Sequence, residues 1–392
     1  MKHRSFLSLA LLSSASLALP AYAGDDTPRI NITGFGTVAL TRSDTADAEF
    51  IRHNQAAGVK KEFRTGVDSN FGIQGTFQLT ERLSAVAQGL VSKNATDAYG
   101  AELTWAFLKY KLNEDWSVRL GRTTPPNYLI SDFRNVGYAN LMIRPPGDMY
   151  RQITVGSIDG VDLLYQRSVG DTTYTAQLNT GRGKRTVPNG AFVDFDRMTT
   201  LHLVAEHGPY TFRYGHTDAR FSFRDAVPLI TLLAGLRNAG FGNVADALNP
   251  YDRHGKFDSL GFGLDYKNVL LQAEYAKKKI NSRAVPDTTS WYAQLGYRYG
   301  QLTPYFMHSY SRQDVPRSFD GLPAASPANN ATKAPQQRDY ALGLRWDFAK
   351  SAALKLQVDH IRPRDGAGGF IKATPQFKGP VNVYAAGVDF VF

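Results

Sequence analysis

Six charged side chains lie in one segment that is too long and too rich in Arg, Pro and Gly for a strand or a tight turn. The segment runs from Gly121 to Arg151, and its charged residues are Arg122, Arg134, Arg144, Arg151, Asp132 and Asp148. An excess of cationic side chains attracts anions through space and needs no covalent chemistry. We interpret the segment as a loop that folds back into a pore and narrows it.

Catalytic and metal-binding patterns are weak. The histidines beyond the N-terminal region show no metal-binding spacing such as HExxH; they are His53, His202, His207, His216, His254, His308 and His360. We therefore expect no metal and no cofactor. The remote alternative, a lipase-like barrel enzyme, needs Ser and His together on one face. His202 and His216 fall on neighbouring expected strands, but His202 faces the expected lumen, so we expect no enzymatic activity.

The N-terminus predicts export. Residues 1–23 combine a basic start, an apolar run from Phe6 to Leu19 and the small-residue ending Ala21-Tyr22-Ala23, which is typical of a cleaved signal peptide. Its removal takes away Lys2 and Arg4, so the formal charge falls from +10 to +8. The absence of cysteine fits an exported chain without disulfides. Residues 24–392 show no linker that would divide them.

Short stretches of alternating apolar and polar residues fill the rest of the chain and predict β-strands. One opening strand, seven hairpins and one closing strand give sixteen, at residues 31–40, 71–79, 83–93, 101–112, 116–123, 161–167, 172–180, 199–206, 210–217, 260–266, 269–276, 290–299, 303–311, 338–348, 353–362 and 382–392. The turns within hairpins are short and the connections between them are long. This layout favours an all-β, 16-stranded antiparallel transmembrane β-barrel over a soluble sandwich.

The alternation assigns a lumen face. In residues 340–348, Tyr340, Leu342 and Trp346 share one face, while Arg345 and Asp347 share the other. A cation facing lipid at mid-bilayer costs about 2 to 4 kcal/mol, so the charged face must be the lumen. The same reasoning places five basic residues on the lumen wall: Arg119, Arg213, Arg298, Arg345 and Lys355.

Two stretches depart from simple alternation. In residues 101–112 the apolar positions switch parity after Phe107, which requires either a β-bulge or burial against another barrel, the latter a hint of oligomerisation. In residues 228–248, Leu229, Leu232, Leu233 and Leu236 follow helical spacing. We expect a short amphipathic helix there that packs on other loops.

The layout resembles the Gram-negative general porins, and the resemblance covers nearly all of residues 24–392. The last strand, residues 382–392, resembles the porin terminal strand, whose final aromatic, here Phe392, is read by the barrel-assembly machinery. Leu120-Gly121-Arg122, Val136-Gly137-Tyr138 and Pro146-Gly147-Asp148 resemble parts of the third loop that porins fold into the barrel. The acidic residue of that motif is missing, and Ile143-Arg144-Pro145-Pro146 stands in its place.

The resemblance implies a homotrimeric channel in the bacterial outer membrane, with residues 121–151 as the constriction loop, in contact with lipid and lipopolysaccharide. The basic excess on loop and wall then predicts passive diffusion of small hydrophilic solutes and ions with a weak anion preference. In water, each charge about 7 Å from an ion contributes roughly 0.6 kcal/mol. The alternative is a substrate-specific channel for one anionic or small acidic nutrient. Nucleic acid is not an expected partner of an exported barrel.

Overall fold

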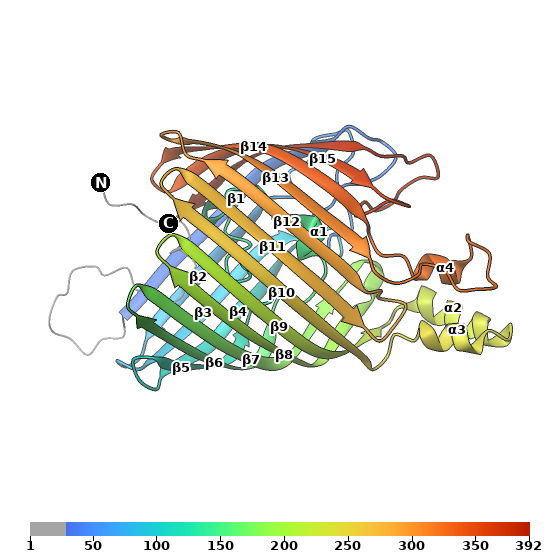
Figure 1. Cartoon of the computed structure of the whole chain (residues 1–392), viewed down its shortest axis with the longest axis horizontal. Coiled ribbons are helices and arrows are strands. Elements are labelled where there is room, and N and C mark those ends of the chain that lie inside the picture. Colours follow the sequence, from blue (N-terminus) through green and yellow to red (C-terminus); the bar gives the residue numbers. More distant parts are fainter. Residues whose placement is uncertain (1–28) are drawn as a thin grey trace.

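The computed structural model describes residues 29–392, and the expected signal peptide at residues 1–23 lies outside this range. Sixteen antiparallel strands close into one barrel in which each strand pairs with the next and β1 pairs with β16 (Figure 1). The strands are β1 (Arg29–Ser43), β2 (Asn70–Gln78), β3 (Leu83–Lys93), β4 (Tyr99–Lys111), β5 (Trp116–Thr123), β6 (Ile158–Val169), β7 (Thr172–Thr186), β8 (Phe192–His207), β9 (Tyr210–Arg224), β10 (Arg253–Tyr266), β11 (Val269–Ile280), β12 (Thr288–Tyr297), β13 (Leu302–Gln313), β14 (Gln337–Ala349), β15 (Ala352–Pro363) and β16 (Val381–Val391).

All sixteen expected strands are confirmed, and β3 and β5 keep the expected bounds. Strands β7 to β10 extend further towards the long connections than alternation alone predicts, so the connection expected at residues 181–198 shrinks to 187–191. We name the long connections L1 to L8 in chain order. Those used below are L1 (44–69), L2 (94–98), L3 (124–157), L5 (225–252), L7 (314–336) and L8 (364–380).

The barrel wall has an apolar outer face and a polar inner face, as the alternation predicts. Leu342 and Trp346 are exposed on the outside of β14, whereas Arg345 between them is buried inside. These outward apolar side chains are exposed to solvent in the isolated chain, and an apolar outer face of this kind is suited to contact with lipid. Among the described residues, no helix is long and apolar enough to cross a membrane.

A β-bulge explains the parity switch in β4. Gln88 pairs with Trp105 and Gly89 pairs with Leu103, so Thr104 is an extra residue in the strand. Leu103 therefore faces outwards, whereas Trp105 and Phe107 face the lumen and pack with Val86. The bulge is confirmed, although it lies earlier than expected. The second apolar environment is the lumen, so β4 gives no sign of contact with another barrel.

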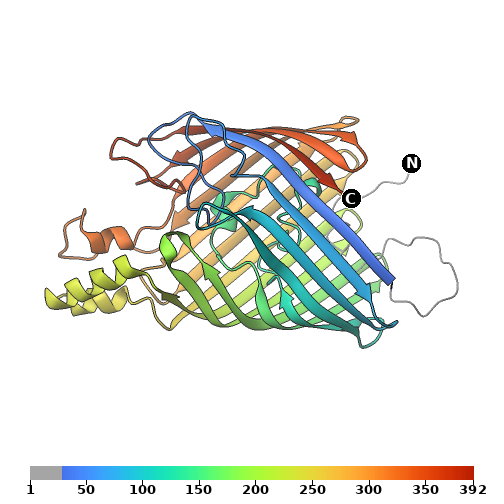
Figure 2. The same ribbon diagram turned by 180° about the vertical axis from the view of Figure 1, so that it is seen from behind.

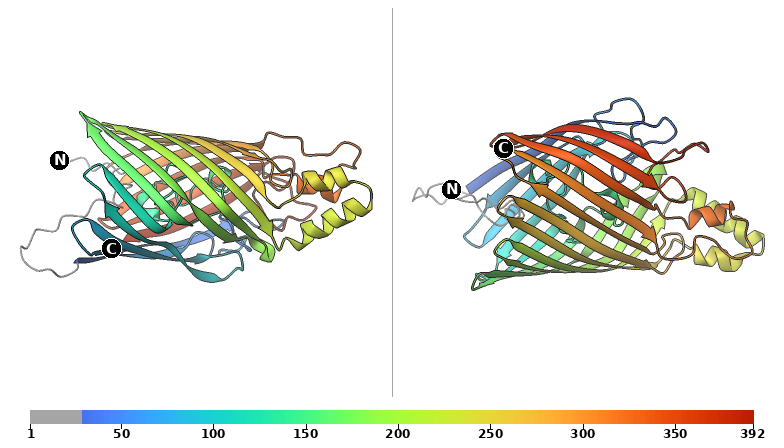
Figure 3. Two further views of the ribbon diagram at one scale, coloured as in Figure 1. Left: turned by 90° about the horizontal axis from the view of Figure 1, so that it is seen from below. Right: turned by 45° about the horizontal axis from the view of Figure 1, so that its top comes forward.

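The expected helix in L5 is confirmed as two helices. They are α2 (Val227–Asn238) and α3 (Gly242–Ala247), and they project beyond the barrel at the end with the long loops (Figure 3). They pack around Leu233 and Leu248 and against α4 (Pro327–Ala331) of L7, as expected for a helix that covers other loops. None of these elements enters the lumen.

Candidate functional site: a constricted lumen

L3 lies inside the barrel, with the short helices η2 (Gly137–Ala139) and α1 (Gly147–Tyr150) within the wall (Figure 1). Residues 121–123, which the sequence analysis included in this loop, belong to β5 instead. An extended peptide in the lumen carries many unpaired carbonyl groups. These groups need donors from the wall.

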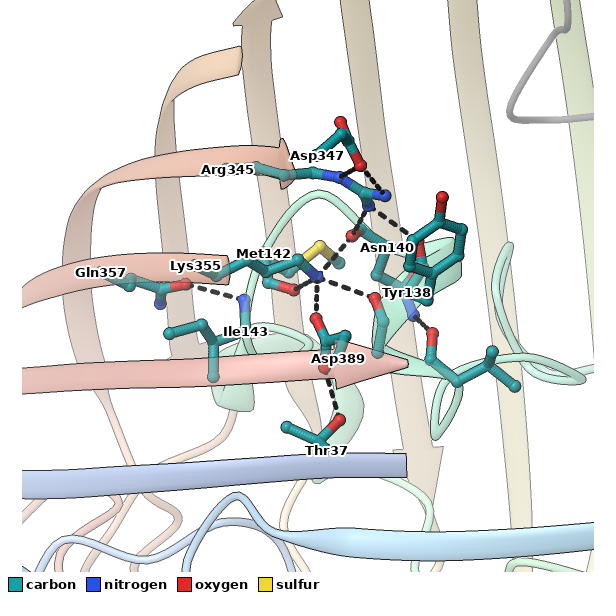
Figure 4. A network of polar contacts seen from close by, with 12 residues as sticks. Thr37, Tyr138, Asn140, Met142, Ile143, Arg345, Asp347, Lys355, Gln357 and Asp389 are labelled. Carbon is teal, nitrogen blue, oxygen red and sulfur yellow. Dashed lines mark hydrogen bonds and ion pairs between the residues drawn. The ribbon is translucent and has the colours of Figure 1, made fainter. Parts of the chain in front are cut away.

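Lys355 and Arg345 supply those donors (Figure 4). The Lys355 ammonium, which is fully buried, donates to the carbonyl oxygens of Gly137 (2.7 Å), Asn140 (2.6 Å) and Met142 (3.0 Å) and pairs with Asp389 (2.7 Å). Arg345 donates to the carbonyl of Asn140 at 2.9 Å. Both bases therefore hold L3 against the wall and are not available to permeating ions.

Arg345 makes two further contacts. Its guanidinium donates to the Tyr138 carbonyl (2.7 Å) and lies 4.8 Å from the centre of the Tyr138 ring. It also donates two hydrogen bonds, of 2.9 and 2.7 Å, to one carboxylate oxygen of Asp347. The charge of Arg345 is thus matched inside the wall.

Arg144, within L3, and Arg213, on β9, fix two further points of the loop. Arg144 forms a bidentate pair with Asp68 (2.8 and 2.7 Å) and a third bond to Asp359 (2.5 Å). Arg213 donates to the Pro126 carbonyl (2.6 Å) and to the Ser259 hydroxyl (2.8 Å). The sequence analysis assigned these basic residues to ion selectivity. In the structure most of them instead hold L3 to the barrel wall.

One side of the lumen is filled. Tyr128, Met149 and Tyr150 of L3 are buried in a cluster with apolar side chains of β8 to β14. Within it the Glu274 carboxylate accepts hydrogen bonds from the hydroxyls of Tyr150 and Tyr292 and from the Leu129 amide. Because burial of an ionised carboxylate requires such donors, this network ties L3 firmly to β11 and β12.

The opposite side remains open. A hollow with a cavity volume of about 130 Å³ lies between L1, L3 and the wall, which here is formed mainly by β1 to β4 with residues of β7 and β13 to β15. Polar and charged side chains alternate with a few apolar ones along it. The charged residues that line it are Arg52, Lys93, Arg134, Arg144, Arg151, Arg185, Glu102, Asp132, Asp339 and Asp359.

L1 is a second inward loop, which the sequence analysis did not predict. The Asn54 side chain donates to the Thr186 carbonyl at the end of β7 (2.9 Å), and Arg52 donates to the Arg134 carbonyl of L3 (3.3 Å). The Ala56 amide donates to the Asn94 carbonyl of L2 (3.3 Å). L1 follows β1 and is drawn in blue in Figure 2. Its tip therefore reaches across the long-loop end of the barrel as far as β7.

The unpaired cations of the hollow come from L1 and L3. Within residues 29–392, Arg52, Arg134 and Arg151 have no carboxylate at ion-pair distance. Burial, and after it the nearby Arg185, lowers the pKa of Arg134 from its ordinary value. Burial together with neighbouring arginines lowers the pKa of His53 to about 3, so His53 is neutral at working pH. Arg52, His53 and Arg185 were not among the sites expected from sequence.

The remaining predicted sites divide into three groups. Arg122 faces outwards and pairs with Asp159 (2.7 Å), so its assignment to the constriction is wrong: Gly121 adopts φ +130° at the end of β5, and the strand pairing puts residue 122 on the outer face. Arg119 faces the lumen but is paired with Asp162. Arg298 pairs with Asp265 (2.6 Å) beyond the short-turn end of β12, away from L3.

The two loop aspartates stay near the constriction. Asp148 is buried and accepts a hydrogen bond from Ser309 (2.7 Å). Burial raises the pKa of Asp148 to about 6 despite the nearby guanidinium of Arg151. Burial also raises the pKa of Asp132. Either carboxyl is therefore easier to neutralise than an exposed one.

Phe392 completes the barrel seam. Its amide and carbonyl exchange hydrogen bonds with Gly34 at 3.0 and 2.9 Å, and its ring covers Gly34, where any side chain would collide with it. The ring also stacks on Phe71, with centroids 6.3 Å apart. The last residue therefore has a structural role at the strand pairing that closes the wall.

The histidines do not gather into a site. His202 faces the lumen and His216 faces outwards, because His202 pairs with Gly215 while Leu201 pairs with His216. His216 bonds to Asp258 at 2.7 Å on the outer face. Within residues 29–392 there is no group of three or more His, Asp or Glu side chains that would hold a metal ion.

No protein-family model and no curated protein sequence matches the chain. Solved structures match almost its whole length. OmpF of Salmonella typhi, in complex with daunomycin, has TM-score 0.58 and 13% identity and covers 94% of this chain and 98% of that one. The outer membrane channel DcaP of Acinetobacter baumannii has TM-score 0.56, 11% identity and coverages of 95% and 100%. OmpT of Vibrio cholerae, an outer membrane protein in trimer form, has TM-score 0.57 and 12% identity and covers 93% of this chain and 99% of that one. At such identities the likeness establishes the barrel fold.

Proposed function

We propose that the protein is an outer-membrane channel for the passive diffusion of small hydrophilic solutes and ions. The observation that carries this proposal is the hollow that L1, L3 and the inner wall enclose, in a closed barrel whose outer face is apolar. A barrel built only as a scaffold has no need for a polar passage beside a loop that is anchored so firmly. The proposal includes no catalytic step and no cofactor.

The ion preference in this proposal is weakly anionic, and its source differs from the one expected from sequence. Lys355, Arg345 and Arg144 are matched by carbonyls and carboxylates, so they add little to the field in the passage. Arg52, Arg134 and Arg151, which form no ion pair within residues 29–392, supply the field, and Arg151 contributes less while the neighbouring Asp148 is ionised. If two of them act at about 7 Å in water, they contribute roughly 1.2 kcal/mol, close to a tenfold preference.

Localisation and partners follow from the same proposal. We place the barrel in the bacterial outer membrane, delivered by a cleaved signal peptide and the barrel-assembly machinery. Lys277 and Lys279 face outwards on β11, where they suit contact with lipopolysaccharide phosphates. The trimer form described for OmpT of Vibrio cholerae supports a homotrimer here.

A substrate-specific channel for an anionic nutrient is the second candidate. It is favoured by Arg52 and Arg134, which both line the hollow and contact each other there through the Arg134 carbonyl. Recording from purified protein in a planar bilayer separates the candidates. Conductance that rises linearly with KCl supports general diffusion, whereas saturation and block by one solute support specificity. No current at all would overturn both.

A further inference from the structure

Three arginines from three separate elements line the hollow beside the tip of L1. Arg52 comes from L1, Arg134 from L3 and Arg185 from the loop end of β7. The Arg52 Nη2 lies 3.3 Å from the Arg134 carbonyl. A Cβ atom placed on Gly156 would lie 3.1 Å from Arg134 Nη2 and 3.9 Å from Arg185 Nη1, so these two groups share one small volume. All three residues line the open hollow.

The charges of this cluster are not balanced. Glu102 bonds to Arg185 at 2.6 Å, and it is the one carboxylate paired with any of the three within the described range of 29–392. Asp132 lines the same hollow without forming an ion pair to them. Arg52 and Arg134 therefore have no carboxylate at ion-pair distance in this range, and Asp68, the acid with the strongest effect on Arg52, is already paired with Arg144. Like charges brought together where water is partly excluded repel strongly, so the folded chain bears a cost here that a bound anion would relieve.

An unused hydrogen-bond donor points to an anionic ligand. The Arg185 Nε is buried and has no hydrogen-bond partner. A buried polar atom without a partner costs free energy in most proteins, and those that persist often belong to a site that a ligand completes. Guanidinium groups match oxyanions because their donors form planar pairs.

We propose that Arg52, Arg134 and Arg185 form a binding site on the permeation path for a small oxyanion with two negative charges. The bound oxyanion bridges L1 to L3 and β7 and gives the guanidinium groups of Arg52 and Arg134 the anionic partner that they lack. Gly156 has no side chain, which leaves the space between Arg134 and Arg185 open. The inference rests on the proposed channel only for the route by which the solute reaches the site.

The test uses two dianions of different chemistry, sulfate and succinate, with acetate as the singly charged comparison at equal ionic strength. Chloride current through the purified protein is recorded in KCl while each anion is added, and binding to the folded protein in detergent is measured by calorimetry. We expect saturable block by at least one dianion and heat of binding at the same concentrations. Block by sulfate alone assigns an inorganic oxyanion, and block by succinate alone a dicarboxylate.

Variants locate the site. Arg134→Gln and Arg52→Gln each remove one charged donor, and we expect the half-blocking concentration to rise about tenfold in each, as the loss of one charge-assisted hydrogen bond predicts. Lys184→Gln is the matched control: it removes the same charge from the neighbouring residue of β7, which is exposed and lies over the Phe192 ring, and it should leave block unchanged.

The outcomes separate the site from the channel. Current without block and without heat of binding overturns the site and leaves the channel. Heat that is lost in Arg134→Gln, in a protein that carries no current, supports the site and overturns the channel. Equal effects of acetate and the dianions, or equal effects of Lys184→Gln and Arg134→Gln, overturn the proposal.

Discussion

Basic residues have two different roles in this lumen. Lys355 and Arg345 hold L3 through its carbonyl groups, whereas Arg134 on L3 itself faces the open hollow. Strand alternation correctly predicted that Lys355, Arg345 and Arg213 face inwards. It does not reveal whether an inward base meets water or a loop, because that depends on how the chain between the strands folds.

Lys355 is the residue whose loss should disturb L3 most. Lys355→Met leaves the Asp389 carboxylate buried without its cation and deprives three carbonyls of a donor. Breaking such a buried pair costs about 3 to 5 kcal/mol. We expect a lower free energy of unfolding in lipid vesicles and larger, noisier single-channel currents. Lys378→Met, at an exposed position of L8, is the control and should change neither; equal behaviour of the two variants would refute the anchoring role.

Asp148 should make the anion preference depend on pH. Burial raises its pKa to about 6, so the carboxyl is largely ionised at pH 7.5 and neutral at pH 5. Acidification therefore removes a negative charge beside Arg151, and the anion preference rises by at most about threefold if the charge acts at about 7 Å in water. Reversal potentials in a fixed KCl gradient measure this. In Asp148→Asn the change between these pH values should shrink to the part that Asp132, whose pKa burial also raises, contributes. A preference that weakens on acidification would contradict the assignment.

At the scale of elements, the two inward loops depend on different kinds of contact. L3 is fixed by buried ion pairs and an apolar cluster, whereas the tip of L1 is held by a few hydrogen bonds to L2, L3 and β7. The sequence placed L3 through its length and its resemblance to a known loop. In L1 the sequence shows only a polar stretch, Arg52-His53-Asn54-Gln55. Neighbouring residues in the sequence do not indicate that the partners of this stretch, Thr186 and Arg134, lie across the barrel.

Asn54 tests the L1 contact. Its φ is 60°, a left-handed conformation that glycine adopts freely, and its side chain makes the bond to the Thr186 carbonyl. Asn54→Gly loses the bond alone, and Asn54→Ala adds a backbone cost of about 1 to 2 kcal/mol. We expect current noise and protease cleavage within L1 to increase from wild type to Asn54→Gly to Asn54→Ala.

A second left-handed residue supplies the control for Asn54. Asp225 in L5 has φ 55° and lies outside the lumen, so Asp225→Ala carries the same kind of backbone strain away from the passage. It should leave the current unchanged. If the current through Asp225→Ala is as noisy as that through Asn54→Ala, the noise arises from backbone strain and not from the lost contact between L1 and β7.

For the whole molecule, the barrel was predictable because a membrane leaves few choices. Every backbone polar group must be paired within the wall, and each strand must show one apolar face, so period-two alternation marks all sixteen strands. The broken alternation in the sequence predicted a bulge in β4. It did not predict that the bulge lies at Thr104, because the position depends on the pairing with β3. Strand ends near L4 were missed because register shifts at Gly181/Gly183 and Phe195/Arg197 interrupt the alternation. Those near L5 were missed because outward residues such as Asp218 and Lys256 are polar, so apolar and polar positions no longer alternate.

The outer face gives a prediction that separates lipid from water. Leu342 on β14 and Val227 on α2 are 65% and 66% exposed in the isolated chain, but only Leu342 faces lipid in the proposed orientation. Leu342→Arg should lower the free energy of unfolding in vesicles by about 2 to 4 kcal/mol. Val227→Arg should change it by less than about 0.5 kcal/mol. Equal costs would show that β14 does not face the bilayer core.

The central claim is that cations of L1 and L3, left unpaired beside the passage, give an open channel a preference for anions. The most direct test is the reversal potential of the purified protein in a planar bilayer separating high and low KCl. The account predicts an ion-conducting channel with a modest chloride preference that shrinks in Arg52→Gln/Arg134→Gln. A potassium preference in the unmodified protein, or a chloride preference that the double variant leaves unchanged, would contradict it.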